Sequence, residues 1–426
     1  MGELSHEPRL GVPYRCWAEV DLSAIRHNAR VAQSMCADTS PSVLAIVKAD
    51  AYGHGAAAVS RALQQASCVF AFGVANVREA IELREAGIDR PVYVLGAALP
   101  AERELLVAHG FIAAVSNQEE ADHFSKLAVE RNKLAKVQIV VDTGMGRMGV
   151  LPDQLLALAQ SAAALPGIEI DSVSSHLPSA DEDSAFTELQ IEGYRRILSQ
   201  LNSAGVKIPR SHIANSAGTM DYPVANGECV RAGLMLYGSA PIPSFQWCLK
   251  PALAWKARVG LVRDLPVGHG INYGRTYITT RPTVAATITA GYADGYPRHL
   301  SGQGTDVLIH GQRCPVLGRI TMDQIVADVT DLVQRPVPVR SRLVRATGRH
   351  DFDGCRAGRE SGHHSVGNLH RNQQAGRPDY PLAILAIREF NFAEIRQVDL
   401  PPAKLVCFDY INYHNNHRLK VIYLLL

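Results

Sequence analysis

Lys48 offers the most distinctive chemistry in this chain. It follows the apolar stretch Val43–Val47, in the sequence Val-Lys-Ala-Asp-Ala-Tyr-Gly-His-Gly. Burial disfavours the charged form of an amine, so a lysine that ends a buried strand tends to have a lowered pKa. Such an amine is a nucleophile that can form a Schiff base. Taken alone, Lys48 is explained more simply by an amine that reaches solvent past the end of the strand.

Further residues that could bind or react follow later apolar stretches or lie within them. Each also has a plain structural explanation: a buried core histidine, a surface ion pair or a helix cap. Their common position at the ends of predicted strands outweighs these separate explanations. In chain order they are Arg147, His176, Asn215, Ser216, Arg231, Gly233 and Leu234.

The elements that would position these residues alternate in type between about residues 43 and 240. Eight short apolar stretches alternate with segments of helical periodicity, which predicts an α/β fold with an N-terminal (β/α)8 TIM-like barrel. An open doubly wound sheet is the alternative. Active sites of such barrels lie at the carboxyl ends of the strands. The predicted strands are 43–47, 69–74, 92–95, 112–115, 137–141, 168–174, 211–214 and 230–236.

The pattern changes after about residue 246. Short alternating strands punctuated by Gly and Pro are expected at 254–262, 283–289, 305–309 and 324–329, which indicates a mostly β domain. We therefore divide the chain into a polar tail (1–13), a barrel (14–245), a β domain (246–339) and an atypical tail (340–426).

The loops after the seventh and eighth strands of such a barrel commonly bind phosphate. Ser216 and the backbone around Gly233 suit that task. A phosphate beside a Schiff-base lysine points to pyridoxal 5'-phosphate (PLP). The segment Gly144–Gly149 also fits the dinucleotide pattern G-x-G-x-x-G, with Asp171 at a suitable distance. Its place in the fifth unit, with an arginine inside the loop, argues against NAD binding.

Composition narrows the class of protein. A net charge of +2 gives no footprint for nucleic acid. Eight scattered cysteines indicate reduced thiols, and no metal site is expected. No apolar run suits a membrane span, and Met1–Tyr14 lacks a signal-peptide core. A cytoplasmic protein is expected.

Taken together, the motifs between about Trp17 and Thr330 resemble the alanine racemase family, whose members carry PLP on a barrel followed by a β domain. The resemblance rests on these stretches: 17–22, 47–55, 141–149, 212–216, 230–238, Asn-Tyr-Gly at 272–274, Gly-Tyr-Ala-Asp-Gly at 291–295 and Gly-Arg-Ile-Thr-Met-Asp-Gln at 318–324.

The resemblance implies a role for each matching position. Lys48 would hold PLP and act as one base. Tyr273, contributed by the other subunit of a homodimer, would be the second base on the opposite face of the substrate. Arg231 would face the pyridine nitrogen, with His176 bonded to it. Tyr52, Asn215, Ser216, Gly233 and Leu234 would lie on the cofactor side; Arg147, the Met322 backbone and Tyr292 would lie on the substrate side.

Two features depart from the family. Many members have a lysine seven residues before the loop arginine, where this chain has Val140, so another group must position Arg147. The family pattern also vanishes from Arg340 to Arg377. Back-translation shifted by one nucleotide permits family-like segments at 340–343, 355–359 and 362–368. We interpret this as an out-of-frame translation that begins near Val339, and we expect weak or absent activity from the chain as written.

The resulting hypothesis is a PLP-dependent racemase that interconverts L- and D-alanine and supplies D-alanine for peptidoglycan. The alternatives are a serine or broad-specificity racemase, an amino-acid decarboxylase on the same fold, and a non-catalytic product of a frameshifted gene.

Overall fold

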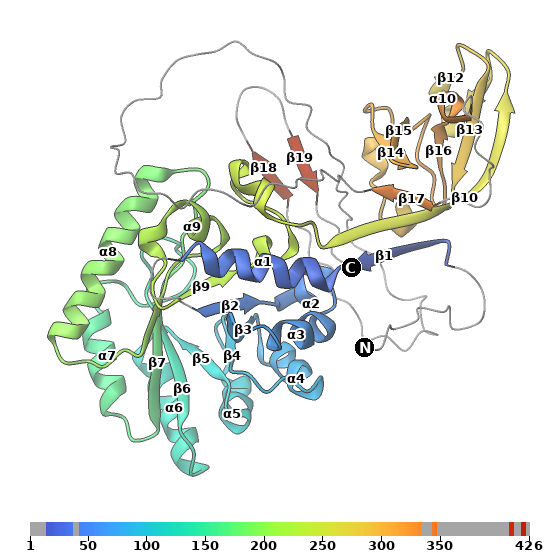
Figure 1. The fold of residues 1–426 in the computed structure, drawn as a ribbon. Helices are drawn as coiled ribbons and strands as arrows, with labels where there is room; N and C mark the ends of the chain where they lie inside the picture. Colours follow the sequence, from blue (N-terminus) through green and yellow to red (C-terminus); the bar gives the residue numbers. More distant parts are fainter. Residues whose placement is uncertain (1–13, 37–41, 334–342, 347–408, 413–418, 423–426) are drawn as a thin grey trace. The chain divides into compact units, whose positions relative to one another are not determined.

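The computed structural model describes residues 14–36, 42–333, 343–346, 409–412 and 419–422. Among these residues, Glu19–Leu253 form one compact unit, and the residues on either side of that range form a second. The first unit is a barrel and the second consists mainly of β-strands (Figure 1).

Eight parallel strands form the sheet of the barrel, in the order β8-β7-β6-β5-β4-β3-β2-β9. Every pairing between neighbours in this order is parallel. The strands are β2 (Ser42–Ile46), β3 (Val69–Val74), β4 (Val92–Val94), β5 (Ile112–Val115), β6 (Ala135–Val140), β7 (Ile168–Ser174), β8 (Arg210–His212) and β9 (Cys229–Ala232).

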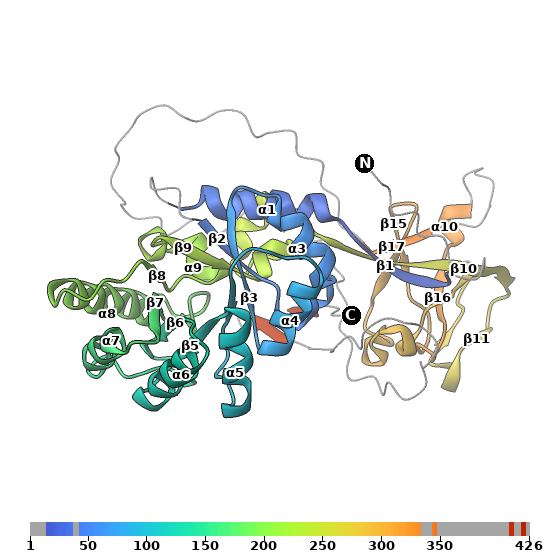
Figure 2. The same ribbon diagram turned by 90° about the horizontal axis from the view of Figure 1, so that it is seen from below.

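Helices lie outside the strands, as Figures 1 and 2 show. Side-chain caps begin several of them: Asn76, Asn117 and Asp183 each accept a backbone N–H in the first turn. The helices are α1 (Leu22–Ser34), α3 (Ala56–Gln64), α4 (Val77–Glu85), α5 (Pro100–His109), α6 (Gln118–Glu130), α7 (Leu155–Ala164), α8 (Ser184–Ser203) and α9 (Ser216–Asp221), with short 3₁₀ turns η1 (Pro223–Ala225), η2 (Leu234–Tyr237) and η3 (Pro243–Cys248).

Successive side chains of β2 belong to two different apolar cores. Val43, Ala45 and Val47 belong to the large core shared with the helices. Leu44 and Ile46 belong to a second cluster with Ala71, Tyr93 and Ile112 from neighbouring strands. Because successive side chains on a strand point to opposite faces, this second cluster fills the inside of the barrel. Lys48 comes next after Leu44 and Ile46 in the inward series.

The ring of strands closes between β8 and β9 through individual bonds. The Arg231 N–H donates to the Ala214 carbonyl over 3.0 Å. The Glu228 carboxylate accepts from both the backbone N–H and the hydroxyl of Ser211, over 2.8 and 2.6 Å. A carboxylate therefore replaces part of a strand ladder at this seam, and the barrel is nearly closed.

The predicted class of fold, a (β/α)8 barrel followed by a mostly β domain, is confirmed, and the open doubly wound sheet is wrong. The predicted eighth strand, 230–236, was too long. Gly233 and Leu234 lie beyond the end of β9, and the chain turns at Leu234 into η2. Residues 14–18, which we assigned to the barrel, group with the β unit because β1 (Cys16–Val20) pairs with β10 (Leu253–Leu265).

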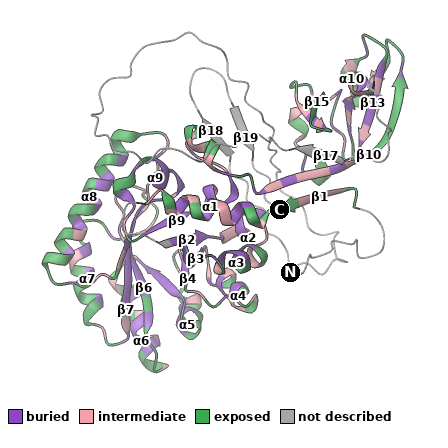
Figure 3. Cartoon of the chain, viewed as in Figure 1, coloured by how far each residue is buried: buried purple, intermediate pink, exposed green. Residues whose placement is uncertain are grey.

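The β unit is built on a seven-stranded sheet, in which β1 pairs with β10 and the other strands follow the order β15-β14-β17-β10-β13-β16. Leu265, Ile271, Ala285 and Leu317 form its core cluster. Figure 3 shows buried residues together with intermediate and exposed ones along its strands. The remaining elements are β11 (Gly270–Ile271), η4 (Tyr273–Arg275), β12 (Tyr277–Ile278), β13 (Thr283–Ile288), η5 (Tyr292–Asp294), η6 (Arg298–Leu300), β14 (Asp306–Ile309), β15 (Gln312–Pro315), β16 (Ile325–Asp328), α10 (Thr330–Val333) and β17 (Leu343–Ala346).

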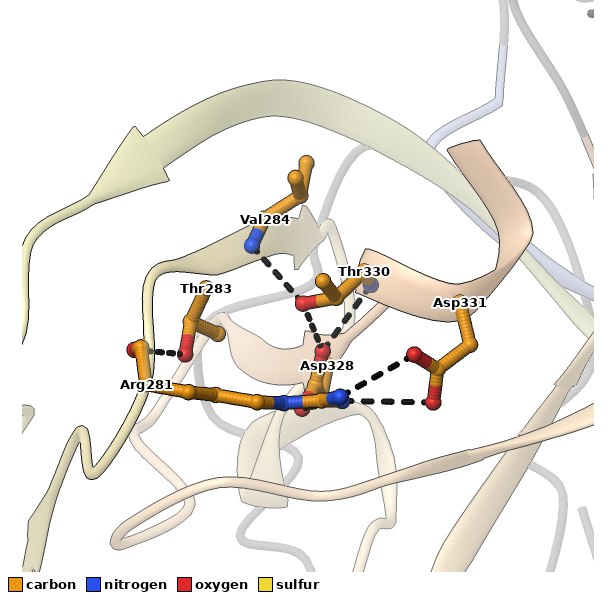
Figure 4. Close-up of polar contacts among 6 residues, drawn as sticks. All are labelled: Arg281, Thr283, Val284, Asp328, Thr330 and Asp331. Carbon is orange, nitrogen blue, oxygen red and sulfur yellow. Dashed lines mark hydrogen bonds and ion pairs between the residues drawn. The ribbon is translucent and has the colours of Figure 1, made fainter. Parts of the chain in front are cut away.

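A polar network connects α10 with the strands beneath it (Figure 4). Arg281 contacts both Asp328 and Asp331, with N···O distances of 3.2 and 3.1 Å. The Thr330 hydroxyl accepts from the Val284 N–H and donates to Asp328. Burial would raise the pKa of Asp328, but its hydrogen bonds to Thr330 and Arg281 outweigh this and lower it.

The segment after residue 339 contributes one strand to the described β sheet. Strand β17 pairs with β10 and, through Val344, with β14. This backbone pairing concerns four residues of the tail that we set at 340–426, and the assignment of that tail stays a prediction. Strands β18 (Asp409–Asn412) and β19 (Leu419–Ile422) form a separate two-stranded sheet. The family-like shifted segments at 355–359 and 362–368 lie outside the described residues.

Candidate functional site

The Lys48 backbone begins a left-handed turn. Residues Ala49, Asp50, Ala51 and Tyr52 all have φ between 52° and 56°. Each such residue costs roughly 1–2 kcal/mol because its Cβ crowds the backbone, so the turn persists only where its surroundings hold it. The Ala51 N–H donates to the Val47 carbonyl over 2.9 Å, and the Asp50 carboxylate accepts from the Ala56 N–H over 2.6 Å.

The Lys48 amine lies among positive charges. Burial is the main reason that the pKa of Lys48 falls below its ordinary value. The charge of Arg147 lowers this pKa further, that of Glu79 opposes the change, and that of Arg231 adds to it. The structure therefore brings Lys48, Arg147 and Arg231 close enough for their charges to interact, and Lys48 loses its proton more readily than an exposed lysine does.

Arg231 is fixed by five hydrogen bonds from its two terminal nitrogens. Nη1 donates to Nδ1 and to the carbonyl of His212, over 2.6 and 2.8 Å. Nη2 donates to the carbonyls of Ser175 and Ile213, over 2.6 and 2.9 Å, and contacts Nδ1 of His176 at 3.2 Å. Among the described residues, Nε–H is the guanidinium group for which no acceptor is present.

Both histidines beside Arg231 must be neutral. A guanidinium has only donors, so Nδ1 of His176 and Nδ1 of His212 accept, and the proton of each ring is on Nε2. Burial, followed by the charge of Arg231, lowers the pKa of His176 to about 3 and that of His212 well below its ordinary range. Burial also lowers the pKa of Arg231 to about 10, which leaves it charged at neutral pH.

Ser216 and Gly233 come together at the end of the barrel where β8 and β9 finish. The Ser216 hydroxyl oxygen accepts from the backbone N–H of Gly233 over 3.0 Å and from that of Met235 over 3.3 Å. Because both contacts use its oxygen, its O–H can still donate. Leu234 follows as the first residue of η2.

Asn215 caps helix α9 with its side chain. Oδ1 accepts from the Gly218 N–H over 2.9 Å, and Nδ2 donates to the Leu177 carbonyl over 2.9 Å. Both polar ends are therefore used within the protein. The structure supports the plain capping explanation for this side chain, which shapes the turn that presents Ser216.

Tyr52 extends from the left-handed turn toward the Ser216 and Gly233 region. A Cβ placed on Gly233 would lie 2.9 Å from the Tyr52 hydroxyl, so a side chain there would collide with the tyrosine. The Tyr52 ring also packs against that of Tyr237, with centroids 5.0 Å apart. Glycine at 233 thus allows the tyrosine hydroxyl to approach the backbone closely.

The loop that carries Arg147 is shaped by Asp142. The Asp142 carboxylate accepts from the N–H groups of Gly144, Met145 and Gly146, over 2.8 to 3.1 Å. Arg147 is exposed, and no hydrogen bond or ion pair joins it to any residue in the described part of the chain. The guanidinium is therefore available for an anionic ligand, and in the described part of the chain the loop that carries it is held by the Asp142 carboxylate.

Tyr273, Tyr292 and Met322 lie in the β unit. Tyr273 begins η4 and is 70% exposed. The neighbouring Asn272 side chain donates to the Arg319 carbonyl over 2.8 Å, which anchors this turn. Tyr292 and Met322 are 37% and 53% exposed. They are tied together because the Tyr292 N–H donates to Thr321 and the Ala293 N–H to Met322, over 3.0 and 2.9 Å.

The barrel residues combine a reactive amine with groups that can bind anions. Lys48 offers a nucleophilic amine, Ser216 a hydroxyl donor, and Arg147 an unpaired cation. The described residues contain no group of three or more His, Cys, Asp or Glu side chains arranged to hold a metal ion. Helices in the described part also lack the length and apolar character needed to cross a bilayer.

Sequence reasoning missed two side chains at this site. His212 was part of a quoted motif but was not assigned a role, because nothing local shows that it faces Arg231. Glu79 contacts the backbone next to Lys48, over 3.0 Å. Its spacing from Asn76 is typical of a helix-capping pair, and this local pattern gives no sign of the second contact, to the backbone after β2.

Comparison with protein families gives two matches. The model described as "Alanine racemase, N-terminal domain" matches residues 20–241, and "Alanine racemase, C-terminal domain" matches residues 252–350. The second match continues about ten residues past the point where we placed the frame change.

Comparison with individual proteins gives consistent results. An alanine racemase from Symbiobacterium thermophilum is 42% identical over 331 residues, which cover 77% of this chain and 86% of that protein. One from Halothermothrix orenii is 41% identical, covering 74% and 83%. The solved alanine racemase from Bartonella henselae with covalently bound pyridoxal phosphate has 30% identity and a TM-score of 0.69, covering 79% of this chain and 92% of that one.

Proposed function

The chain belongs to the alanine racemase family, and we propose that it interconverts L- and D-alanine with pyridoxal 5'-phosphate bound at Lys48. The observation that carries this proposal is the Lys48 amine itself, which is half-buried at the end of β2, has a lowered pKa and interacts with the charges of Arg147 and Arg231. A relative with covalently bound pyridoxal phosphate supports the choice of cofactor.

The residues present fit this cofactor. Lys48 can bond its aldehyde carbon. The Ser216 hydroxyl, with its oxygen occupied by two backbone N–H groups, can donate to a phosphate oxygen. Tyr52 reaches the same region. The Nε–H of Arg231, which has no acceptor among the described residues, is the donor that would meet a pyridine nitrogen.

When bound, the cofactor supplies an electron sink that allows an amino acid to lose its α-proton. Racemisation then needs one group to remove this proton and another to return it on the opposite face. We assign these tasks to the Lys48 amine and the Tyr273 hydroxyl. A lowered pKa helps Lys48 because the free amine, not the ammonium group, accepts a proton.

Arg231 would act by keeping its proton. Its pKa of about 10 leaves the guanidinium charged, so it would not give up a proton to a ring nitrogen at neutral pH. The neutral histidines His176 and His212 hold it in place without adding charge. We infer that this arrangement limits the electron sink and so reduces side reactions.

The substrate carboxylate would bind on the other side of the site. Arg147 offers a guanidinium that has no carboxylate partner in the described chain. The backbone of Met322 would make the second contact to the substrate carboxylate. Tyr292 would lie at the entrance. Since Tyr273, Tyr292 and Met322 are exposed in the β unit, we propose a homodimer in which this surface completes the partner's site. We also propose a cytoplasmic location and a supply of D-alanine to peptidoglycan.

The test uses the purified full chain with added PLP. Borohydride reduction followed by peptide mapping should place the cofactor on Lys48, and L-alanine should be converted to D-alanine with exchange of its α-proton for solvent deuterium. Lys48→Ala should abolish labelling at this position, whereas Tyr273→Phe should keep labelling and lose the conversion of L-alanine to D-alanine.

The same reaction mixture separates the alternatives. Faster turnover of serine would indicate a serine or broad-specificity racemase, and release of an amine and CO₂ would indicate a decarboxylase. Labelled Lys48 with no turnover of any amino acid would indicate a non-catalytic product. Absence of labelling in the wild-type chain would remove the basis of the proposal.

A further inference from the structure

Glu79 joins the ends of two neighbouring barrel strands. It lies in the first turn of α4, directly after β3. One carboxylate oxygen, Oε2, accepts from the Ala75 N–H over 2.8 Å. The other, Oε1, accepts from the Ala49 N–H over 3.0 Å, next to Lys48 at the end of β2. A single carboxylate therefore satisfies a backbone donor from each strand end.

The first turn of helix α6 offers an internal comparison with that of α4. Helix α6 begins like α4, with an asparagine cap at Asn117 and a glutamate three residues later. The Glu120 carboxylate accepts from the Ser116 N–H over 2.7 Å, which is the equivalent of the bond from Ala75 to Glu79. Among the described contacts, Glu120 has no bond to a neighbouring strand end. The contact to Ala49 is thus additional to helix capping.

We propose that Glu79 is a positioning residue for Lys48: it holds the backbone N–H of Ala49 and so fixes the left-handed turn from which the lysine amine is presented to the cofactor. This inference rests on the proposed function of Lys48. Ala49 is the first of five consecutive residues with positive φ, of which the last is Gly53. A donor fixed at the start of the turn decides where the Lys48 side chain begins.

The Glu79 charge has a second effect on Lys48, which is separate from its hold on the backbone. Lys48 faces Arg147, Arg231 and Glu79, and among these three Glu79 is the anion. Its charge raises the pKa of Lys48 and so offsets part of the effect of the two arginines. Loss of the carboxylate should therefore change both the place and the titration of the amine.

The experiment compares Glu79→Gln with Glu120→Gln in the full chain. Both variants lose a carboxylate at a helix cap, so Glu120→Gln controls for any loss of helix stability in Glu79→Gln. We measure the rate at which Lys48 becomes covalently linked to added PLP, trapped by borohydride. Glu79→Gln should slow capture about tenfold, equivalent to about 1.4 kcal/mol, and Glu120→Gln should leave it within about twofold. Equal rates in both variants would overturn the proposal.

A second measurement does not use the cofactor. The pH dependence of acetylation of Lys48 by acetic anhydride, followed by mass spectrometry, gives the titration midpoint of the amine in cofactor-free protein. The midpoint should fall in Glu79→Gln and stay unchanged in Glu120→Gln. An unchanged or raised midpoint in Glu79→Gln would count against the proposal. If the wild-type chain captures PLP at Lys48 but forms no D-alanine, the proposed function is contradicted. The role of Glu79 in presenting Lys48 is then still tested by the two variants.

Discussion

Nδ1 of His212 lies 2.6 Å from Nη1 of Arg231, and this contact determines the tautomer of the histidine. Since the guanidinium only donates, the His212 proton must be on Nε2. That atom is buried and has no hydrogen-bond partner in the described structure. The protein thus leaves one ring nitrogen unsatisfied in order to give Arg231 an acceptor.

Replacement of His212 should show that the acceptor matters more than the ring. In His212→Leu, the buried Arg231 loses a partner, and the free energy of unfolding should fall by about 2–3 kcal/mol, the range for a hydrogen bond to a buried charge. Asn can offer an oxygen near the place of Nδ1, so His212→Asn should lose less than half as much. Urea unfolding measures both, and equal losses would contradict the prediction.

Stability should fall in acid because His176 is neutral in the folded state. Its folded pKa of about 3 lies below the ordinary value of 6.5, so the unfolded chain binds a proton first as the pH falls. Stability is therefore present above pH 6.5 and is lost as the pH falls from there toward 3. The loss between pH 7 and 5 is about 2 kcal/mol for this residue.

Urea unfolding of the cofactor-free protein at the two pH values provides the check. His176→Asn removes the titrating group, so this variant should lose about 2 kcal/mol less between pH 7 and 5 than the wild type does. The same dependence in both proteins would assign the acid sensitivity to other groups. His212 contributes with the same sign, since its pKa is also lowered.

Replacement of Arg147 should weaken substrate binding and change Lys48 at the same time. Arg147→Gln removes an exposed cation, so KM for alanine should rise about tenfold, the effect of one lost charge-assisted hydrogen bond. The pKa of Lys48 should rise, because the charge of Arg147 now lowers it. Steady-state kinetics and the acetylation midpoint test the two effects, and Arg131→Gln, at a surface ion pair with Glu104, is a control.

The segment after residue 339 should limit activity. If the frame changes there, codons 340–368 read one base later will spell Glu-Val-Val-Leu, Ala-Glu-Leu-Ala-Glu and Gly-Thr-Ile-Pro-Trp-Glu-Ile. Nucleotide sequencing decides this directly. A chain with the restored frame should racemise alanine at least tenfold faster than the 426-residue chain, as the β domain would regain its missing part. Codons that forbid these segments, or equal turnover, would show that the present tail is functional.

The class of fold and most barrel elements were predictable because they depend on local periodicity. Strand ends were less predictable: β9 stops at Ala232 where the apolar pattern continues, since Gly233 turns the chain toward Tyr52. Lys48 was recognisable from its place after a strand. Glu79 and His212 were not, because their partners come from strands that only the closed barrel brings together. The side chain of Asn215 caps α9, and its place beside the cofactor stays a prediction.

The seam of the barrel has a consequence for how the protein is made. Strand β9 pairs with β2 on one side and reaches β8 through the bonds of the seam on the other, so the ring closes only after residue 232 has left the ribosome. The side chains of the barrel site, from Lys48 to Leu234, have all been synthesised soon after that point. A change of reading frame near residue 339 comes too late to alter any of them, so we expect a chain with the altered tail to capture the cofactor at Lys48 even where turnover of the substrate is lost.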